Sequence, residues 1–345
     1  MCNIAGYVGS RPAAPILIEM LKKQEGFAGG YYSGIATLHE GKVYYAKCIG
    51  DVERLLKTTN ARSLPGTVGI IHSRSKAGGD ERWAHPFVSE REGSVQSAYV
   101  ANGAAGMFAS RREEAESVAA RLESLGYTFP SRTGETNGYI SLTNGDCIHM
   151  SDLMAQLIQS HVDMGKNTVA AMNDSFAELP GEIVGLLLQA GSEASITWSR
   201  INMPMFLSFA DHGAYLASSS LAIPNDAREA TLLPCLSGGK VFARSYTVVP
   251  YSRRICDMKA IDDSILHSAY DTVQRVLQKG GGCTFSDLYK PLKPLFGVCE
   301  CNDAEPLCYR ILEAFFKEGK LSWENKSENG VSDGLTAPKT YFYLK

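Results

Sequence analysis

The sequence predicts an α+β protein with a layered domain over residues 2–255 and a smaller module over residues 256–345. In the first part, helix-like segments lie between two sets of strand-like segments, which is typical of helices packed on sheets. After about residue 255, three amphipathic helices and two terminal strands predict a small winged-helix-like module. A chain of 345 residues also exceeds the usual size of a single core, which agrees with two units.

Composition excludes several other classes of protein. A hydrophobic share of 44% is enough to drive folding, and a net charge of −3 gives no general attraction to nucleic acid or to anionic membranes. No apolar run approaches the roughly 20 residues of a membrane helix. Because Cys2 follows Met1 at once, we expect no signal peptide, and the nine cysteines then predict reduced thiols in the cytoplasm.

The elements of the first domain follow from hydrophobic period and capping residues. Residues 2–9 alternate apolar and small side chains and predict a strand, whereas residues 13–24 place apolar side chains at helical spacing. Residues 111–126 predict an amphipathic helix ended by Gly126, and a later helix is expected to be capped by Ser151 or Asp152. The other predicted elements are a helix at 167–178 and the strands TVGIIHS, SAYVANG, EIVGLLLQ, ASITWSR, MFLSFA and AYLASS.

The tail has its own pattern of elements. Its predicted helices are DDSILHSAYDTVQRVLQKGG, FSDLYKPLKPLF and AEPLCYRILEAFFKEG, and its last 24 residues read as two strands around a polar loop. Residues 261–345 hold ten Lys or Arg and twelve Asp or Glu, so we expect no binding to DNA. The side chains expected to form a small core are Ile265, Leu277, Leu292, Leu312, Phe315 and Phe316.

A set of chemically active residues lies on predicted strand ends and loops of the first domain. Each alone has an ordinary structural explanation, such as a small core cysteine, a tight Asn-Gly turn or a helix cap. Together they suggest a catalytic site. The candidate site residues are Cys2, Arg74, His85, Asn102, Gly103 and Asp152.

The chemistry of these residue types suits the hydrolysis of an amide. Once Met1 is removed, Cys2 carries a thiol and an α-amine of similar proton affinity, so the amine can act as the base for the nucleophile. An Asn side-chain amide and the backbone N–H of Gly103 can direct two donors at one oxyanion. Arg74 can bind a carboxylate and Asp152 an ammonium group, which are the two ends of an α-amino acid.

In the order and spacing of its segments the sequence resembles the class II, or N-terminal nucleophile, glutamine amidotransferase domain, most like that of glutamine–fructose-6-phosphate aminotransferase. The resemblance covers about residues 2–225. It rests on the segments CNIAGYVG, SGIATL, GIIHSR, AHPFVSE, YVANG, LESLGYTF, SDLMAQLI, ELPGEIVGLLL and YLASSSLAI.

The resemblance implies a four-layer αββα sandwich, the N-terminal nucleophile hydrolase fold. It implies that Cys2 is the nucleophile and that Asn102 and Gly103 form the oxyanion hole. It further implies that Arg74 binds the glutamine carboxylate and Asp152 the glutamine amine. The counterpart of His85 lies near the site in the family, which implies a role in positioning the substrate.

The sequence also departs from the family pattern. The run Ser75-Lys76-Ala77-Gly78 follows Arg74 where relatives have Trp and then Thr-His, and Ala28 stands where relatives have Arg. The segment before the helix that carries Asp152 is longer than in the family. These departures predict a reshaped substrate pocket.

The expected function is hydrolysis of the glutamine side-chain amide through a thioester on Cys2. Fewer than about 100 residues follow the first domain, which ends at residue 255, and this is too few for the sugar-isomerase domains of the aminotransferase. We therefore expect the ammonia acceptor on a separate synthase subunit, and we expect the tail to hold that partner or a second copy of this chain. On this view, deletion of the tail would leave amide hydrolysis largely intact.

Two alternatives remain open. One is hydrolysis of another γ-glutamyl amide by the same Cys2 chemistry, and the other is a ligand-sensing regulatory protein that acts through the tail. We expect neither a cofactor nor a metal. The cysteines of the tail do not have standard zinc-finger spacing; they are Cys283, Cys299, Cys301 and Cys308.

Overall fold

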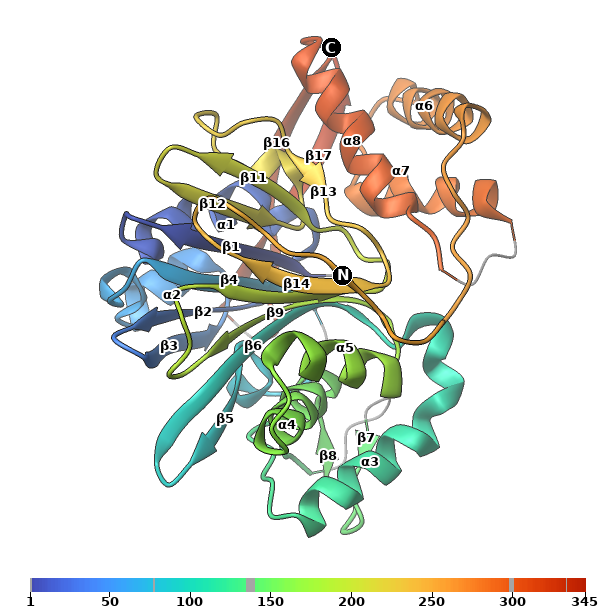
Figure 1. Ribbon diagram of the computed structural model, residues 1–345. Helices are drawn as coiled ribbons and strands as arrows, with labels where there is room; N and C mark the ends of the chain where they lie inside the picture. Colours follow the sequence, from blue (N-terminus) through green and yellow to red (C-terminus); the bar gives the residue numbers. More distant parts are fainter. Residues whose placement is uncertain (1, 77, 135–139, 298–300, 333) are drawn as a thin grey trace.

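The computed structural model describes residues 2–76, 78–134, 140–297, 301–332 and 334–345; Met1, Ala77 and Cys299 lie outside the described residues. These residues form a layer of helices, two stacked antiparallel sheets and a second layer of helices (Figure 1). The α+β class is therefore as predicted. None of the described helices has both the length and the apolar character needed to cross a membrane.

The first sheet has seven strands, with β1 at its centre. Strand β1 pairs antiparallel with β12 on one side and with β4 on the other, so both of its edges are covered. Strand β1 is buried along nearly its whole length, which explains why most of the first residues of the chain are apolar or small. In spatial order the strands are β13 (Thr231–Leu232), β11 (Phe206–Ala210), β12 (Gly213–Ala217), β1 (Asn3–Gly9), β4 (Val68–Arg74), β2 (Tyr32–His39) and β3 (Lys42–Ile49).

The second sheet has six strands and lies against the first. The core between the two sheets takes side chains from both, among them Ile4 and Val8 on β1 and Val184 and Leu186 on β9. In spatial order the strands are β15 (Val249–Pro250), β14 (Ser237–Val241), β10 (Ile196–Arg200), β9 (Glu182–Gln189), β6 (Ser94–Ala104) and β5 (Phe87–Arg91).

Helices α3 (Arg112–Ser124), α4 (Met150–Asp163) and α5 (Thr168–Glu178) cover the outer face of the second sheet, below it in Figure 1. A short hairpin, β7 (Ile140–Ser141) with β8 (Cys147–Ile148), precedes α4. All three helices were predicted, but the expected cap of α4 was wrong. The N-cap is His149, whose Nδ1 accepts a hydrogen bond from the backbone N–H of Ser151 at 3.0 Å.

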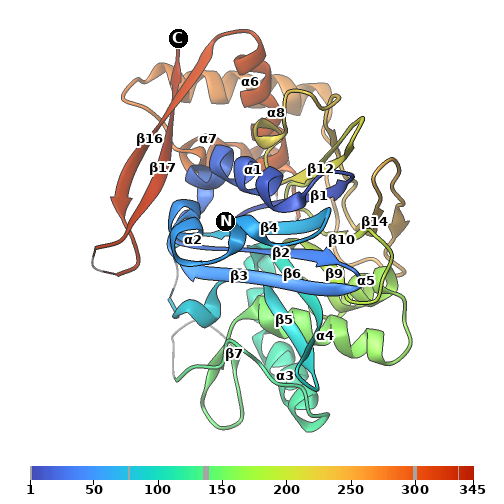
Figure 2. The same ribbon diagram turned by 90° about the vertical axis from the view of Figure 1, so that its left-hand side faces the viewer.

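The other helical layer covers the first sheet and combines the two ends of the sequence. Figure 2 shows α1 beneath the C-terminal helices, with the terminal hairpin running beside it. Between α7 and α8 a 3-10 helix spans Lys290–Phe296. The elements of this layer are α1 (Ala13–Ala28), α2 (Val52–Thr58), α6 (Asp263–Gln278), α7 (Phe285–Tyr289), α8 (Ala304–Lys317), β16 (Leu321–Asn329) and β17 (Thr336–Leu344).

The predicted helices and hairpin of the tail are present, and five of its six predicted core residues are buried. The exception is Phe316, which is 50% exposed and packs its ring against Trp323 with 4.9 Å between centroids. A backbone bridge joins Cys283 to Phe342 on β17. The winged-helix-like assignment and the boundary at residue 255 stay predictions.

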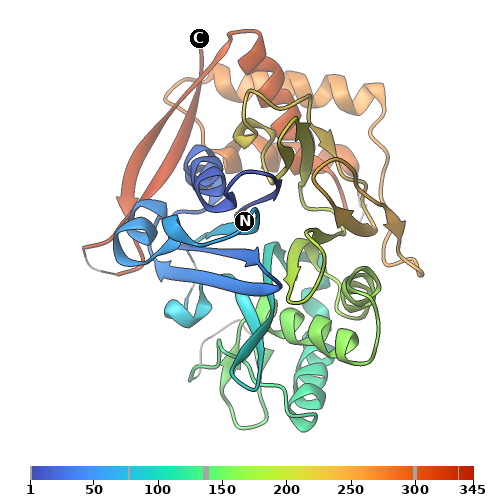
Figure 3. The ribbon, with the colours of Figure 1, turned by 60° about the vertical axis from the view of Figure 1, so that its left-hand side comes forward.

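The side chains of the tail share one core with those of the first domain, which bears on the expectation that deletion of the tail would leave amide hydrolysis largely intact. Tyr309 on α8 lies 6.2 Å from Phe27 on α1 and 6.5 Å from Phe206 on β11, measured between ring centroids. A buried ion pair joins Arg200 on β10 to Asp303, just before α8. Figure 3 shows the tail over the first sheet and α1, so its deletion would expose apolar side chains of the first domain.

The position of Glu25 predicts a pH-dependent stability. This carboxylate lies near the end of α1, and its Oε2 accepts a hydrogen bond from the backbone N–H of Val52 at 3.0 Å. Burial raises the pKa of Glu25 to about 8. The raised pKa means that the folded protein binds a proton at Glu25 more tightly than the unfolded chain does. The stability due to Glu25 therefore falls as pH rises from about 4.5 to 8.

We expect Glu25→Gln to raise the free energy of unfolding at pH 7 by on the order of 3 kcal/mol, since glutamine keeps the acceptor and needs no proton uptake on folding. The gap to the wild type should widen between pH 5 and pH 8 in denaturant titrations. Glu19→Gln, on an exposed part of the same helix, should show no such trend. A gap for Glu25→Gln that does not change with pH would contradict the assignment.

Candidate active site

A cavity of about 420 Å³ lies where the start of β1 and the ends of β4 and β6 meet the beginning of α4. Four of the six predicted site residues line it, and they come from parts of the chain that are far apart in sequence. These four are Cys2, Arg74, His85 and Gly103. The structure therefore gathers most of the predicted constellation around one space.

Cys2 lies directly before β1 and is held against the end of β6. Its backbone nitrogen donates a hydrogen bond of 2.8 Å to Oδ1 of Asn102, which brings together residues 100 positions apart. Removal of Met1 would turn this nitrogen into the α-amine. Because the Asn102 oxygen takes that hydrogen bond, its amide nitrogen is the end of the side chain that can donate to a substrate.

Gly103 follows Asn102 in a conformation that favours glycine, with φ of 130°. A Cβ atom there would lie 2.0 Å from the backbone oxygen of Glu182 on the neighbouring strand. The close pairing of β6 with β9 therefore requires glycine at this position. The same pairing places the Asn102-Gly103 peptide on the wall of the cavity.

The guanidinium group of Arg74 is held in place before any substrate binds. It lies 4.6 Å from the ring centroid of Tyr32, and its NH2 donates a hydrogen bond of 3.1 Å to the backbone oxygen of Gly78. Its NH1 donates to the backbone oxygen of Trp83 at 3.4 Å. The side chain is only 2% exposed yet lines the cavity, so its charge is oriented by the surrounding loop.

Three histidines form a packed group behind the cavity. The rings of His72 and His85 stack with 3.7 Å between centroids, and His149 meets His85 edge-on at 5.4 Å. Burial lowers the pKa of all three rings, so they are neutral near pH 7. The Nε2 of His72 lies 3.0 Å from the backbone oxygen of Ala101, so this buried ring has a hydrogen-bond partner in the core. His85 lines the cavity, and neither of its ring nitrogens has a partner among the described residues.

Asp152 is not among the residues that line the cavity. Its Oδ2 accepts hydrogen bonds from the backbone N–H of Ser131 at 2.8 Å and from the Ser131 hydroxyl at 2.7 Å. Its Oδ1 accepts one from Gln156 at 3.1 Å. Burial raises the pKa of Asp152 to about 6, and the carboxylate is occupied in joining α4 to the preceding loop. The expectation that it receives a substrate amine stays a prediction.

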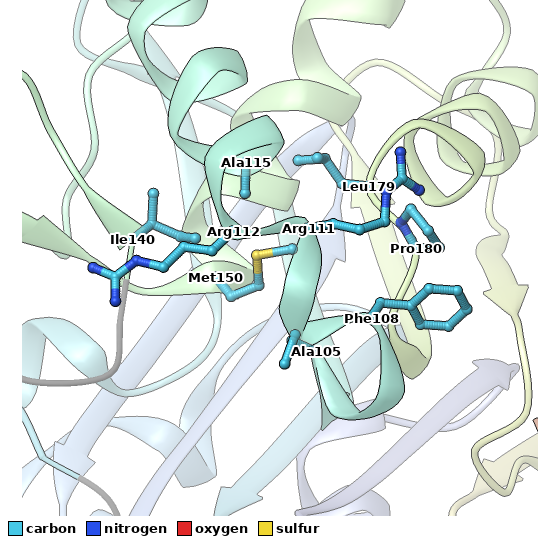
Figure 4. A pocket seen from close by; sticks show the side chains of 10 residues that line it. Ala105, Phe108, Arg111, Arg112, Ala115, Ile140, Met150, Leu179 and Pro180 are labelled. Atoms are coloured by element: carbon cyan, nitrogen blue, oxygen red, sulfur yellow. The ribbon is translucent and has the colours of Figure 1, made fainter. Parts of the chain in front are cut away.

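The residues on either side of this carboxylate line the cavity in its place. Met150 and Met154 on α4 form part of an apolar wall together with Ile140, Leu179 and Ile183. A smaller cavity of about 110 Å³ adjoins this wall, and Figure 4 shows Met150 lying between Ile140 and Leu179 there. Sequence reasoning missed this wall, because the start of α4 was placed at Ser151 or Asp152.

Among the residues that the structure describes, no group of three or more His, Cys, Asp or Glu side chains could hold a metal ion. The tail cysteines are not gathered at one place. Cys301 packs against Met107 in the core below the second sheet, whereas Cys283 and Cys308 lie in the core above the first.

Individual proteins of known name are similar to a large part of this chain. No family model matches the chain. The glutamine–fructose-6-phosphate aminotransferase [isomerizing] of Brucella suis biovar 1 (strain 1330) is 29% identical over 225 residues, which are 65% of this chain and 32% of that protein. The enzyme of the same name from Pyrococcus horikoshii is 28% identical over 235 residues, 68% of this chain and 35% of that protein. The chain thus spans about a third of the length of these curated relatives.

Among solved structures, the glutamine phosphoribosylpyrophosphate amidotransferase from B. subtilis aligns with a TM-score of 0.58 and 18% identity. The alignment covers 81% of this chain and 58% of that one. At this identity the likeness concerns the fold alone. The family resemblance stated from the sequence is confirmed by these matches.

Proposed function

We propose that this chain, which contains a class II glutamine amidotransferase domain of the N-terminal cysteine amidohydrolase type, hydrolyses the side-chain amide of glutamine. The observation that carries the proposal is the hydrogen bond of 2.8 Å from the Cys2 nitrogen to Asn102, next to the 420 Å³ cavity that Cys2 and Gly103 line. In this proposal Cys2 supplies the nucleophile and the base, and the Asn102 amide supplies a donor.

The proposed reaction begins at the Cys2 thiol. The α-amine takes the thiol proton, and the sulfur attacks the carbon of the substrate carboxamide. The oxyanion that forms accepts hydrogen bonds from the Asn102 amide nitrogen and the Gly103 backbone N–H. Collapse of this intermediate breaks the C–N bond, and the ammonium group of Cys2 returns its proton to the leaving ammonia.

A γ-glutamyl thioester then remains on Cys2. The free α-amine takes a proton from water as the water oxygen attacks the thioester carbon, and collapse releases glutamate and restores the thiol. On this proposal the ammonia is consumed by an acceptor on another polypeptide, and the cytoplasmic location and any homo-oligomer stay predictions. The whole activity of the longer relatives is not carried over to this chain.

Substrate recognition in this proposal rests on Arg74 and His85. The fixed guanidinium of Arg74 is suited to the substrate α-carboxylate, because it lines the cavity and its orientation costs no further ordering. The neutral ring of His85 can donate from one nitrogen and accept at the other, which suits a polar group of the substrate.

Arg74→Lys should raise KM for glutamine by about 10- to 150-fold, which corresponds to roughly 1.5–3 kcal/mol, with a smaller change in kcat. Lysine keeps the charge but loses the planar fork and the stacking on Tyr32. Steady-state assays of glutamate release would measure the effect. Arg82→Lys, on the same loop but facing solvent, is the matched control. Equal KM values in the two variants would argue against the role of Arg74.

Asp152→Asn should behave differently from Arg74→Lys. Its carboxylate bonds to Ser131 and Gln156, so we expect a lower thermal midpoint and a KM close to that of the wild type. A selective rise in KM with unchanged stability would instead support the substrate role that the sequence predicts for it.

Release of glutamate from glutamine by the purified chain, after removal of Met1, tests the proposed function directly. The apolar wall at Met150 and Met154 favours one second candidate, a γ-glutamyl amide that carries an apolar substituent on its nitrogen. Glutamine and γ-glutamyl anilide should therefore be compared in the same assay. Turnover of the anilide alone would select the second candidate, and turnover of neither would contradict both.

A further inference from the structure

Glu305 brings a buried carboxyl group from the tail to the region behind Gly103. The residue lies in the first turn of α8 and is 7% exposed, and its Oε2 has no hydrogen-bond partner among the described residues. The ion pair between Arg200 and Asp303 anchors the start of this helix two residues earlier. The carboxyl group is therefore held at one place with an unpaired oxygen, which makes its charge sensitive to nearby groups.

A second cavity, of about 120 Å³, is the place where this carboxyl group meets the wall of the Cys2 cavity. Glu305 and Gly103 both line it, and Gly103 also lines the cavity that contains Cys2. Asn102, the residue before Gly103, accepts the 2.8 Å hydrogen bond from the Cys2 nitrogen. One short stretch of β6 therefore borders both the carboxyl group of the tail and the nitrogen that becomes the α-amine.

Electrostatic interactions cross this stretch of chain. Burial raises the pKa of Glu305 to about 8, although the positive amino terminus of the chain lowers it. The Cys2 thiol acts on the same carboxyl group and raises its pKa. An α-amine has an ordinary pKa of roughly 7.7–8.0, so the two groups bind a proton with similar affinity. Groups that interact in this way lose their protons as a coupled pair.

The other charged groups around Glu305 act on it less than the amino terminus does. Lys293, exposed on the 3-10 helix, lowers its pKa, and Glu182 on β9 raises it. Glu182 has a partner of its own, because the Nδ2 of Asn202 donates to its Oε1 at 3.4 Å. Burial raises the pKa of the remaining titratable neighbours, which are therefore uncharged near pH 7; these are Tyr289, Cys308 and Tyr309.

We propose that Glu305 is a positioning residue for the reaction at Cys2, and that its carboxylate stabilises the ammonium form of the Cys2 α-amine. This role rests on the proposed function, in which the amine accepts the thiol proton before the sulfur attacks. Positive charge then develops on the amine, and a carboxylate behind the wall of the cavity lowers the cost of that charge. Glu305 itself takes no proton from the thiol or from the substrate.

The acidic limb of the pH profile of kcat/KM for glutamine tests this role, because it reports the base of the free enzyme. Glu305→Gln keeps the shape of the protonated carboxyl group and removes its charge. It should move the limb to lower pH by on the order of one pH unit, since the ammonium form loses a stabilising charge. Glu305→Asp keeps the charge and should give a limb closer to that of the wild type. Glu318→Gln, at the exposed end of the same helix, should leave the limb unchanged.

NMR titration of the α-amine measures the same effect without turnover. The chain for this experiment lacks Met1 and carries Cys2→Ala, so that no thiol titrates beside the amine. Adding Glu305→Gln should lower the midpoint of the amine by on the order of one pH unit. Equal midpoints with and without Glu305→Gln would overturn the proposal, and so would a limb of kcat/KM that moves while the midpoint does not.

Lys293→Gln gives a second test of opposite sign that leaves the buried side chain in place. Loss of this positive charge should move the titration curve of the amine and its coupled carboxyl group to higher pH, and an unchanged curve would contradict the proposal. If Glu305→Gln lowers the midpoint but the wild type hydrolyses no amide, the link between Glu305 and the amine stands and the proposed function fails. Hydrolysis of glutamine with equal midpoints gives the reverse result.

Discussion

Replacing Cys2 with alanine should abolish amide hydrolysis, with a loss of at least about 10⁴ in kcat, because no other group at this point of the cavity can form the thioester. The expected cause is chemical and not structural. Cys2 precedes β1, and the backbone nitrogen that bonds to Asn102 is kept in the variant. Glutamate release should disappear while the thermal midpoint stays close to that of the wild type.

A chain that keeps Met1 provides the matched control for the role of the α-amine. In that chain the thiol is present, but the nitrogen of Cys2 belongs to a peptide bond and cannot accept a proton. We expect it to be nearly as inactive as Cys2→Ala, although the thiol still reacts with alkylating reagents. Full activity of either protein would contradict the proposed mechanism.

Replacing Asn102 with aspartate should lower kcat by on the order of 10²–10³, the usual cost of losing one donor to an oxyanion. Aspartate has almost the same shape, and its oxygen can still accept the hydrogen bond from the Cys2 nitrogen, which measures 2.8 Å in the wild type. What it cannot do is donate. Steady-state kinetics should therefore show a fall in kcat with little change in KM.

Asn102→Ala separates the two roles of this residue. It removes both the donor and the acceptor that holds Cys2, so its kcat should fall below that of Asn102→Asp. Binding of glutamate as a product inhibitor should survive in both variants, because the carboxylate site at Arg74 is untouched. An effect confined to KM in Asn102→Asp would refute the oxyanion assignment.

The structure gives the tail contacts that the sequence did not predict. Charge and pattern alone favoured a module that holds a partner, and that role stays a prediction. In the structure, α8 packs on α1 and β11 and carries Glu305 to a cavity that borders Gly103. A variant that lacks the tail would therefore lose core contacts and the Glu305 carboxylate together, and it could not separate the two effects.

The sequence by itself determined the local elements and pointed to Cys2 as the proposed nucleophile. Strand β1 with Cys2 before it, the helices of both layers and the terminal hairpin all follow from the period of apolar residues, which depends only on neighbours along the chain. The order of short segments also carried the family resemblance. It pointed to six candidate site residues, four of which line one cavity in the structure.

Only the tertiary structure decided which side chains meet. Cys2 and Asn102 are 100 residues apart, and their contact depends on how two sheets stack. Helix α4 begins at Met150, so Met150 faces the cavity while Asp152, two residues on, points to Ser131 and Gln156. The spacing of apolar residues shows that one face of a helix is buried, but it does not show which elements that face packs against. The sequence therefore could not place Glu305 beside the wall of the active site.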